Sequence, residues 1–423
     1  MSETRTVPEP TLMAPAEERL HLIDTLRAIA LFGVITMNIT GMVAALADDR
    51  IFPAATSLDL AFASFDLIVL QGKARSCFAF LFGVGFGILM ARAATKGSNF
   101  VGFYLARMTA LLAIGLCNLA FLFWGDILIL YALLGIAMLA FRNASDRLVL
   151  SLGLALILLP PVVFGAIEAA TGAPMPSLAG LGPDAADEAM AALEPVYSRG
   201  SYAEFVQANL QLYFDGYRTD TAHAVTYDVG VLGLFLLGLW AARGGLFADV
   251  ERWRPLFRKL AWLCLPLGLL LSLIHATRWM GIEADGAAYG LVTAAYAGLP
   301  IAAFGYIAIL TLWLSRGGAG VQRALSPMGR MALTGYLASN AAGAFIWYGW
   351  GLGQLGAWNF AAMNLLALIL FAALCLFSAA WIRRFRFGPF EWLWRSATYG
   401  KLQPMRRSAA GLPPARRSPP ARR

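Results

Sequence analysis

Residues 21–42 read HLIDTLRAIALFGVITMNITGM and form the first long apolar run of the chain. The run carries an acidic and a basic residue, Asp24 and Arg27, in its opening turns. Charged side chains are costly inside a bilayer, so a pair at this depth indicates a functional site by default. On a helix, Asn38 falls on the same side, roughly 16 Å beyond Arg27 at about 1.5 Å per residue. This polar stripe either lines a site or is a structural ion pair that sets helix depth and packing.

The composition of the whole chain fits a membrane protein. Of its 423 residues, 59% are hydrophobic and only 14% are charged, and the mean hydropathy is +0.65. Soluble domains average about 25% charged residues. Apolar runs near 20 residues recur, each long enough to cross a bilayer as a helix. The runs are continuous rather than alternating, which argues against a membrane barrel. The sequence therefore predicts an all-α, polytopic integral membrane protein.

The apolar runs predict eleven helices. Lys and Arg concentrate on the cytoplasmic side of short loops. Placing both termini and the basic short loops there requires an even number of crossings. The predicted helices are 22–45, 57–71, 74–93, 103–123, 125–141, 147–169, 224–242, 257–277, 287–315, 331–350 and 358–382.

The segment 57–71 breaks this even count. If it crossed, the basic residues near Arg92 would lie outside. Asp59, Asp66 and Lys73 also recur every seven residues and give the segment one polar face. The segment is therefore predicted to be a re-entrant or interfacial helix on the outer side, which leaves about ten transmembrane helices.

The chain divides around these helices into segments of different charge. Residues 383–423 hold eleven Lys or Arg and one Glu, a net charge of +10. This exceeds the net charge of +8 for the whole chain. The remainder is nearly neutral, so no nucleic-acid partner is expected, whereas a basic juxtamembrane tail attracts anionic lipid. The oligomeric state stays open. The predicted segments are 1–20 cytoplasmic, 21–169 transmembrane, 170–223 an outer loop, 224–382 transmembrane, 383–403 an interfacial helix and 404–423 a disordered tail.

Metal and nucleophile motifs are absent from the sequence. The four cysteines, Cys77, Cys117, Cys264 and Cys375, each stand alone in an apolar run, so no metal or redox site is predicted. There is no GxxxxGK[ST], HExxH, GxSxG or zinc spacing. Of the few histidines, His223 opens a helix on the predicted outer side. A lone histidine is more often a hydrogen-bonded polar residue than a catalyst.

Two further polar groups lie close to apolar runs. Lys73 and Arg75, within QGKARS, suggest an anion clamp for phosphate or carboxylate, with Asp66 and Asp126 as candidate partners. Snorkelling at the membrane interface explains them equally well. Asp126, in the Trp-Gly-Asp turn at 124–126, either caps the helix that follows or acts as a general acid or base.

The C-terminal third adds two spaced pairs. Arg330 and Thr334 stand four apart and share one helix face. Arg330 is either a topology determinant or a contact to the phosphate of a nucleotide-bearing donor. Glu391 and Arg395 form an i,i+4 pair in GPFEWLWR, which predicts a structural lock at the membrane surface.

Several of these motifs resemble a known family. DTLRAIA (24–30) resembles the D-x-L-R-(G/A)-x-A start of the transmembrane acyltransferase superfamily. The version that ends in Asn38 is similar to the YeiB-like family of bacterial membrane proteins, whose C-terminal part is a domain of unknown function. Four further matches follow in the family's order and span nearly the whole chain. They are FAFLFGVGFG (78–87), WGDILILYALLG (124–135), PMGRMALTGYL (327–337) and FGPFEWLWR (387–395).

The resemblance implies a multi-pass protein of the bacterial inner membrane that uses acyl-CoA. It would pass the acyl group to a small-molecule or glycan acceptor at the outer face, with Arg27 and Arg330 at the CoA phosphates. One related branch carries a histidine fourteen residues after the motif Asp, where this chain has Asn38. The YeiB-like pattern usually has another where this chain has Asn118. Asn cannot take a proton at neutral pH, so the base would be Asp126 or His223.

The alternative is a non-enzymatic transporter of a proton, a small anion or a metabolite. In that case, Asp24, Arg27, Asp66, Lys73 and Asp126 would form a buried relay. Binding of acyl-CoA to the purified protein separates the two hypotheses.

Overall fold

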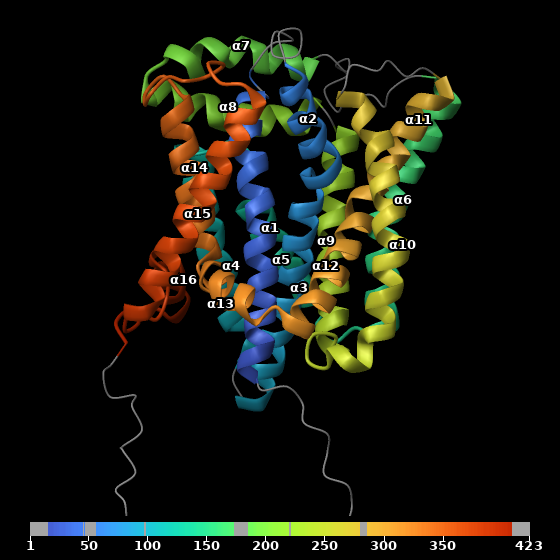
Figure 1. The fold of residues 1–423 in the computed structure, drawn as a ribbon, viewed down its shortest axis with the longest axis vertical. Helices are drawn as coiled ribbons and strands as arrows, with labels where there is room; N and C mark the ends of the chain where they lie inside the picture. Colours follow the sequence, from blue (N-terminus) through green and yellow to red (C-terminus); the bar gives the residue numbers. More distant parts are fainter. Residues whose placement is uncertain are drawn as a thin grey trace, which may run out of the picture.

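The computed structural model is a bundle of helices that run between two ends (Figure 1). It describes residues 16–44, 46, 56–96, 99–172, 185–219, 221–279 and 286–407. These residues contain helices and one isolated bridge, and no strand is present among them. Eight of the described segments are long and apolar enough to cross a membrane. The predicted fold class, an all-α polytopic membrane protein, is confirmed.

The first half of the chain forms nine helices within the described residues. They are α1 (Ala16–Ala44), α2 (Ser57–Phe65), the π-helix η2 (Asp66–Leu70), α3 (Lys73–Lys96), α4 (Phe100–Phe121), α5 (Leu128–Ala137), η3 (Met138–Phe141), α6 (Asp146–Thr171) and α7 (Ala185–Arg199).

The second half continues in the same way. Its helices are α8 (Tyr202–Thr219), α9 (Thr221–Arg243), α10 (Val250–Ala276), η4 (Thr277–Trp279), α11 (Gly286–Ala294), η5 (Ala295–Ala297), α12 (Gly298–Gly317), α13 (Ala319–Arg330), α14 (Ala332–Trp347), α15 (Phe360–Arg384) and α16 (Pro389–Tyr399).

The two ends of the bundle carry different short helices. In Figure 1, α7 and α8 lie across the top, and α13 and α16 lie toward the bottom. The start of α1 is at the α13 side, because His21 Nδ1 lies 3.1 Å from Ser326 Oγ. We call these the α7 end and the α16 end. The sequence predicts that 170–223 lies opposite the termini, and α7 and α8 do lie opposite the start of α1.

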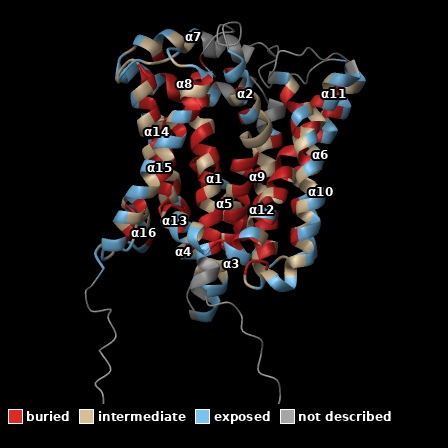
Figure 2. Ribbon diagram, viewed as in Figure 1, coloured by how far each residue is buried: buried red, intermediate tan, exposed pale blue. Residues whose placement is uncertain are grey.

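Burial separates central helices from peripheral ones (Figure 2). About two thirds of the most apolar stretch of α1 is buried inside the protein. The corresponding share is 17% in α15 and 22% in α10. Large apolar side chains on the peripheral helices are exposed, among them Trp262, Leu263 and Leu376. A broad exposed apolar surface of this kind marks a membrane-facing side.

Short polar residues mark the starts of the spanning helices. Asn99, Ser145 and Asn359 accept hydrogen bonds from backbone N–H groups three residues on, at the starts of α4, α6 and α15. Thr56 and Asp59 form a reciprocal capping box at the start of α2. These caps satisfy N–H groups that a helix cannot satisfy internally.

Residues 57–71 differ from the separate helix that the sequence predicts. In the structure α2, η2 and α3 follow one another along a single helical path, Ser57–Thr95, interrupted at Gln71 and Gly72. Gly72 has φ of +74°, a left-handed conformation that glycine adopts without strain. The segment thus runs on toward α3 but is separated from it by this break, and its position relative to the bilayer stays a prediction.

Other elements depart from the expected boundaries. α10 begins at Val250 rather than at 257, and the predicted helix 287–315 divides into α11, η5 and α12. α5 begins at Leu128 rather than at 125, because residues 122–127 form an irregular connection. The amphipathic α13 was not expected as a helix, since its apolar residues are too few for a span. After α15, the chain extends through Phe385, which bridges to Arg406, before α16 begins. Residues 408–423 of the predicted tail lie outside the described residues.

Glycines in the motifs mark close helix contacts. A Cβ at Gly83 would lie 2.1 Å from the Phe235 carbonyl oxygen, and one at Gly87 would lie 2.5 Å from Ala242 Cβ. These two glycines of FAFLFGVGFG stand four apart and let α3 pack against α9. In α13, a Cβ at Gly329 would lie 1.7 Å from the Asp24 carbonyl oxygen. The short α13 therefore rests directly on the backbone of α1.

Candidate functional site

A cavity of about 430 Å³ lies among α1, α3, α4, α5, α14 and α16. Its lining includes Arg92, Arg330 and Arg386, which are exposed. The cavity therefore reaches the surface at the α16 end. Its volume lies in the range of about 300–1,000 Å³ that is usual for small-molecule sites.

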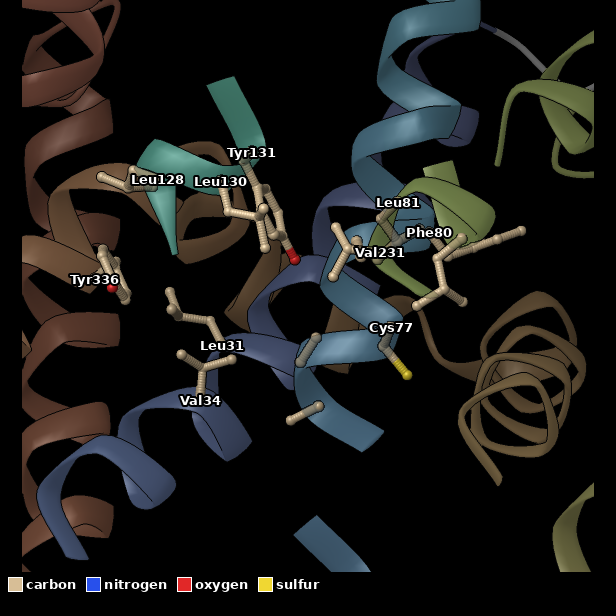
Figure 3. Packing of buried hydrophobic residues seen from close by; sticks show 14 of the residues in the cluster. Leu31, Val34, Cys77, Phe80, Leu81, Leu128, Leu130, Tyr131, Val231 and Tyr336 are labelled. Atoms are coloured by element: carbon tan, nitrogen blue, oxygen red, sulfur yellow. The ribbon is translucent and has the colours of Figure 1, made fainter. Parts of the chain in front are cut away.

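The described lining is basic at one side and apolar at the other. It includes six arginines and two carboxylates, Asp24 and Glu391. The apolar part includes Leu31, Leu128 and Tyr131, which Figure 3 labels among the buried apolar residues. An open basic mouth joined to an apolar interior suits a molecule with an anionic head and an apolar or neutral arm.

The first motif provides one wall of this cavity. Arg27 Nη1 donates to Asp24 Oδ1 at 2.9 Å, with the two side chains 27% and 12% exposed. Gly85 of α3 makes room for Arg27, since a Cβ there would lie 3.3 Å from Arg27 Nη2. The pair predicted from the sequence is formed, and both of its members line the cavity.

We expect Arg27→Ala to lower folded yield as well as activity. Removing Arg27 leaves Asp24 buried without its charged partner, which costs roughly 3–5 kcal/mol in a soluble interior. The double variant Asp24→Ala with Arg27→Ala should recover yield but not activity. Size-exclusion chromatography and thermal unfolding of both variants check this. Full function in the double variant would make the pair structural only.

The Trp-Gly-Asp turn places Asp126 beside the inner part of the cavity. Asp126 Oδ1 accepts from the Ile129 N–H at 2.8 Å, which caps the start of α5 as predicted. Its other oxygen accepts from Asn118 Nδ2 at 2.6 Å. The adjacent Ile127 lines the cavity, and its N–H donates to Tyr336 Oη at 3.4 Å. Asp126 is therefore one residue removed from the cavity wall.

Three asparagines extend from Asp126 as a chain of hydrogen bonds. Asn340 Nδ2 donates to Asn118 Oδ1 at 3.2 Å, and Asn38 Nδ2 donates to Asn340 Oδ1 at 2.9 Å. Asn118 and Asn340 are buried. Asn38 and Asn118 are the two positions where the patterns that this chain resembles carry histidine. The structure joins them through Asn340, which the sequence analysis missed.

Comparisons with known proteins show the family to which the chain belongs. A family described as "Protein of unknown function (DUF418)" matches residues 241–401. "Uncharacterized protein YxaH" of Bacillus subtilis (strain 168) is 31% identical over 415 residues, which cover 94% of this chain and 98% of that protein. "Uncharacterized protein YeiB" of Escherichia coli (strain K12) is 28% identical over 400 residues, 90% and 96% of the two chains. The chain belongs to the YeiB-like DUF418 family.

All five motifs of this DUF418 protein contribute to the cavity lining. The lining residues include Arg27, Gly85, Tyr131, Tyr336 and Glu391, which come one from each motif. They lie far apart in the sequence and on five different helices. This convergence makes the cavity the candidate functional site.

Thr334 and Glu391 are bound to each other rather than to the partners expected from their spacing. The Thr334 N–H donates to Glu391 Oε1 at 2.9 Å, and Thr334 Oγ1 donates to Glu391 Oε2 at 2.5 Å. Thr334 Oγ1 also accepts from the Phe390 N–H. Burial raises the pKa of the Glu391 carboxyl above its usual value, although the hydrogen bonds from Thr334 act in the opposite direction. The hydrogen bonds between Thr334 and Glu391 attach α16 to α14, so Thr334 has a structural role here.

Among the described residues, Arg395 does not form the predicted i,i+4 ion pair, and Glu391 accepts hydrogen bonds from Thr334 instead. Its guanidinium lies instead 4.4 Å from the centre of the Phe387 ring. It also lines the cavity. Spacing alone could not show this, since the partner of Glu391 comes from a helix 57 residues earlier.

Lys73 and Arg75 lie away from the cavity. The fully buried Lys73 donates to the Leu67 carbonyl oxygen. Arg75 stacks on the Tyr227 ring at 3.6 Å and lines a separate pocket of about 20 Å³. Asp66 accepts from Asn364, so neither Asp66 nor Asp126 is the partner predicted for these cations. Lys73 and Arg75 therefore do not contribute to the cavity lining.

His223 opens α9, but its side chain lies outside the described residues. Across the part of the chain that the structure describes, no three His, Cys, Asp or Glu side chains gather as metal ligands.

Proposed function

We propose that this DUF418 protein is an acyltransferase of the bacterial cytoplasmic membrane. It takes an acyl group from cytoplasmic acyl-CoA and passes it to a small-molecule or glycan acceptor at the opposite face. The observation that carries the proposal is the shape and charge of the cavity, with arginines at its mouth and apolar walls within. The α16 end then faces the cytoplasm, where basic residues such as Arg383 and Arg384 are favoured.

The donor fits this cavity in one orientation. Its phosphates lie at the mouth, where Arg27 and Arg330 line the wall, because arginine binds phosphate through paired donors. The linear arm extends between apolar side chains toward Tyr131 and Tyr336. The thioester then lies near Ile127, next to Asp126.

Asp126 is the base in this proposal. The acceptor's hydroxyl oxygen attacks the thioester carbonyl carbon, so that a C–O bond forms and the C–S bond breaks. The hydroxyl proton passes to the Asp126 carboxylate and then to the leaving CoA thiolate. Hydrogen bonds from Asn118 and Ile129 hold the carboxylate in place. Its position beside the cavity supports Asp126 as the base.

Isothermal titration of the purified protein with acetyl-CoA and longer acyl-CoAs tests the proposal. We expect saturable binding that Arg330→Lys weakens about tenfold, or roughly 1.4 kcal/mol, because Lys lacks the paired donors of Arg. A folded wild-type protein that binds no acyl-CoA would favour the transporter hypothesis, with Asp24, Arg27, Asp66, Lys73 and Asp126 as the relay.

A further inference from the structure

Three arginines that line the cavity inside its exposed rim form a group from three helices. Arg27, Arg107 and Arg395 come from α1, α4 and α16, and each is partly buried. Arg107 lies close enough to Arg27 and Arg395 for their charges to repel one another. We call these residues the arginine trio.

The described lining of the cavity holds two carboxylates, Asp24 and Glu391, against the three cations of the trio. Asp24 pairs with Arg27. Glu391, the other lining acid, already accepts two hydrogen bonds from Thr334. Arg395 Nε is buried without a hydrogen-bond partner in the described structure. Three positive charges against these two carboxylates leave a net charge of +1, and Arg92, Arg330 and Arg386 at the rim add three more. Uncompensated charge in a partly buried place is costly.

Aromatic rings hold two members of the trio in place. The Arg107 guanidinium stacks on Trp394 at 3.6 Å, and Trp394 Nε1 donates back to the Arg107 carbonyl oxygen at 2.7 Å. Arg395 lies over Phe387. Stacking restrains a guanidinium while leaving the N–H donors along its edge available to a planar or tetrahedral anion.

We propose that the arginine trio is the binding subsite for a phosphate group that carries two negative charges. This assignment rests on the proposed function, because it specifies the part of the donor that the cavity recognises. A phosphate monoester carries about −1.5 to −2 charges at neutral pH, which offsets part of the net positive charge of the cavity lining. A phosphate of this kind occurs in a nucleotide-bearing soluble donor and in the headgroup of phosphatidic acid.

Titration calorimetry on the full-length protein in nanodiscs tests the trio directly. The probes are acetyl-CoA and adenosine 3′,5′-bisphosphate, which has the phosphates of CoA without its arm. We expect Arg395→Gln to weaken both at least tenfold and Arg395→Lys to weaken them less. Arg383→Gln removes a charge from the same end of the bundle, outside the cavity lining, and should change affinity less than twofold.

Adding phosphatidic acid to the nanodisc distinguishes a lipid headgroup from a soluble donor as the source of the phosphate. If phosphatidic acid in the nanodisc binds in a way that Arg395→Gln abolishes, and neither acetyl-CoA nor the bisphosphate binds, the trio binds a lipid headgroup, and the soluble-donor proposal fails alone. Acetyl-CoA binding at wild-type affinity in folded Arg395→Gln and Arg107→Lys would overturn the trio and leave the proposed function standing.

Discussion

Asp126→Asn is expected to abolish acyl transfer while leaving folding and donor binding near wild type. Asparagine retains an oxygen that can accept the hydrogen bond from the Ile129 N–H, as Asp126 Oδ1 does. Asparagine also caps helices as well as aspartate does. It cannot take a proton at neutral pH. General bases contribute about 10²–10⁴-fold to rate, so we expect a loss in that range. The measurement is thiol release from acetyl-CoA by proteoliposomes supplied with bacterial membrane extract as acceptor.

The control for this variant is Asp146→Asn. Asp146 is a solvent-exposed acid bonded to Arg243 outside the cavity lining, so its loss should leave thiol release unchanged. Undiminished thiol release by Asp126→Asn would show that Asp126 is only a helix cap, and the proposed chemistry would need another base.

Gly329→Ala should greatly lower the yield of folded protein. The new Cβ would lie 1.7 Å from the carbonyl oxygen of Asp24, which is backbone and cannot rotate away. α13 would have to move off α1, and the wall of the cavity that holds Arg330 would move with it. Overpacking of this kind costs about 1–3 kcal/mol and occasionally more, and we expect the upper part of that range.

Gly320→Ala is the matched control, because it lies in the same helix and nothing lies within 4 Å of the added Cβ. Alanine is favoured over glycine in helices by about 1 kcal/mol, so this control should be neutral or stabilising. Melting temperature and monodisperse yield in detergent compare the two. Equal stability of the two variants would contradict the close contact between α13 and α1.

The sequence was sufficient for features that depend on local pattern. Continuous apolar runs predicted the helical membrane fold, and a charged pair within one of them predicted the Asp24–Arg27 contact. The Trp-Gly-Asp turn indicated Asp126 as either a helix cap or a general acid or base, and the hydrogen bond from Ile129 fits the first. Each of these features depends on residues close together in the chain, where spacing and chemistry decide the geometry.

Features made by distant helices were not predictable in the same way. Asn340 is a single amide in an apolar run, and only the packing of α14 against α1 and α4 joins it to Asn38 and Asn118. Glu391 stands four residues from Arg395, yet Thr334 of another helix takes both of its oxygens. Spacing on one helix cannot show which groups a neighbouring helix will offer.

The central claim, that the cavity holds the donor, is tested most directly by partly filling it. Leu111 of α4 is buried and lines the cavity, whereas Leu116 of the same helix is 50% exposed on the outer side. Acetyl-CoA affinity should fall at least tenfold in Leu111→Trp and stay at the wild-type value in Leu116→Trp, both measured by titration calorimetry on folded protein. Unchanged affinity in Leu111→Trp, or equal losses in the two variants, would contradict the account.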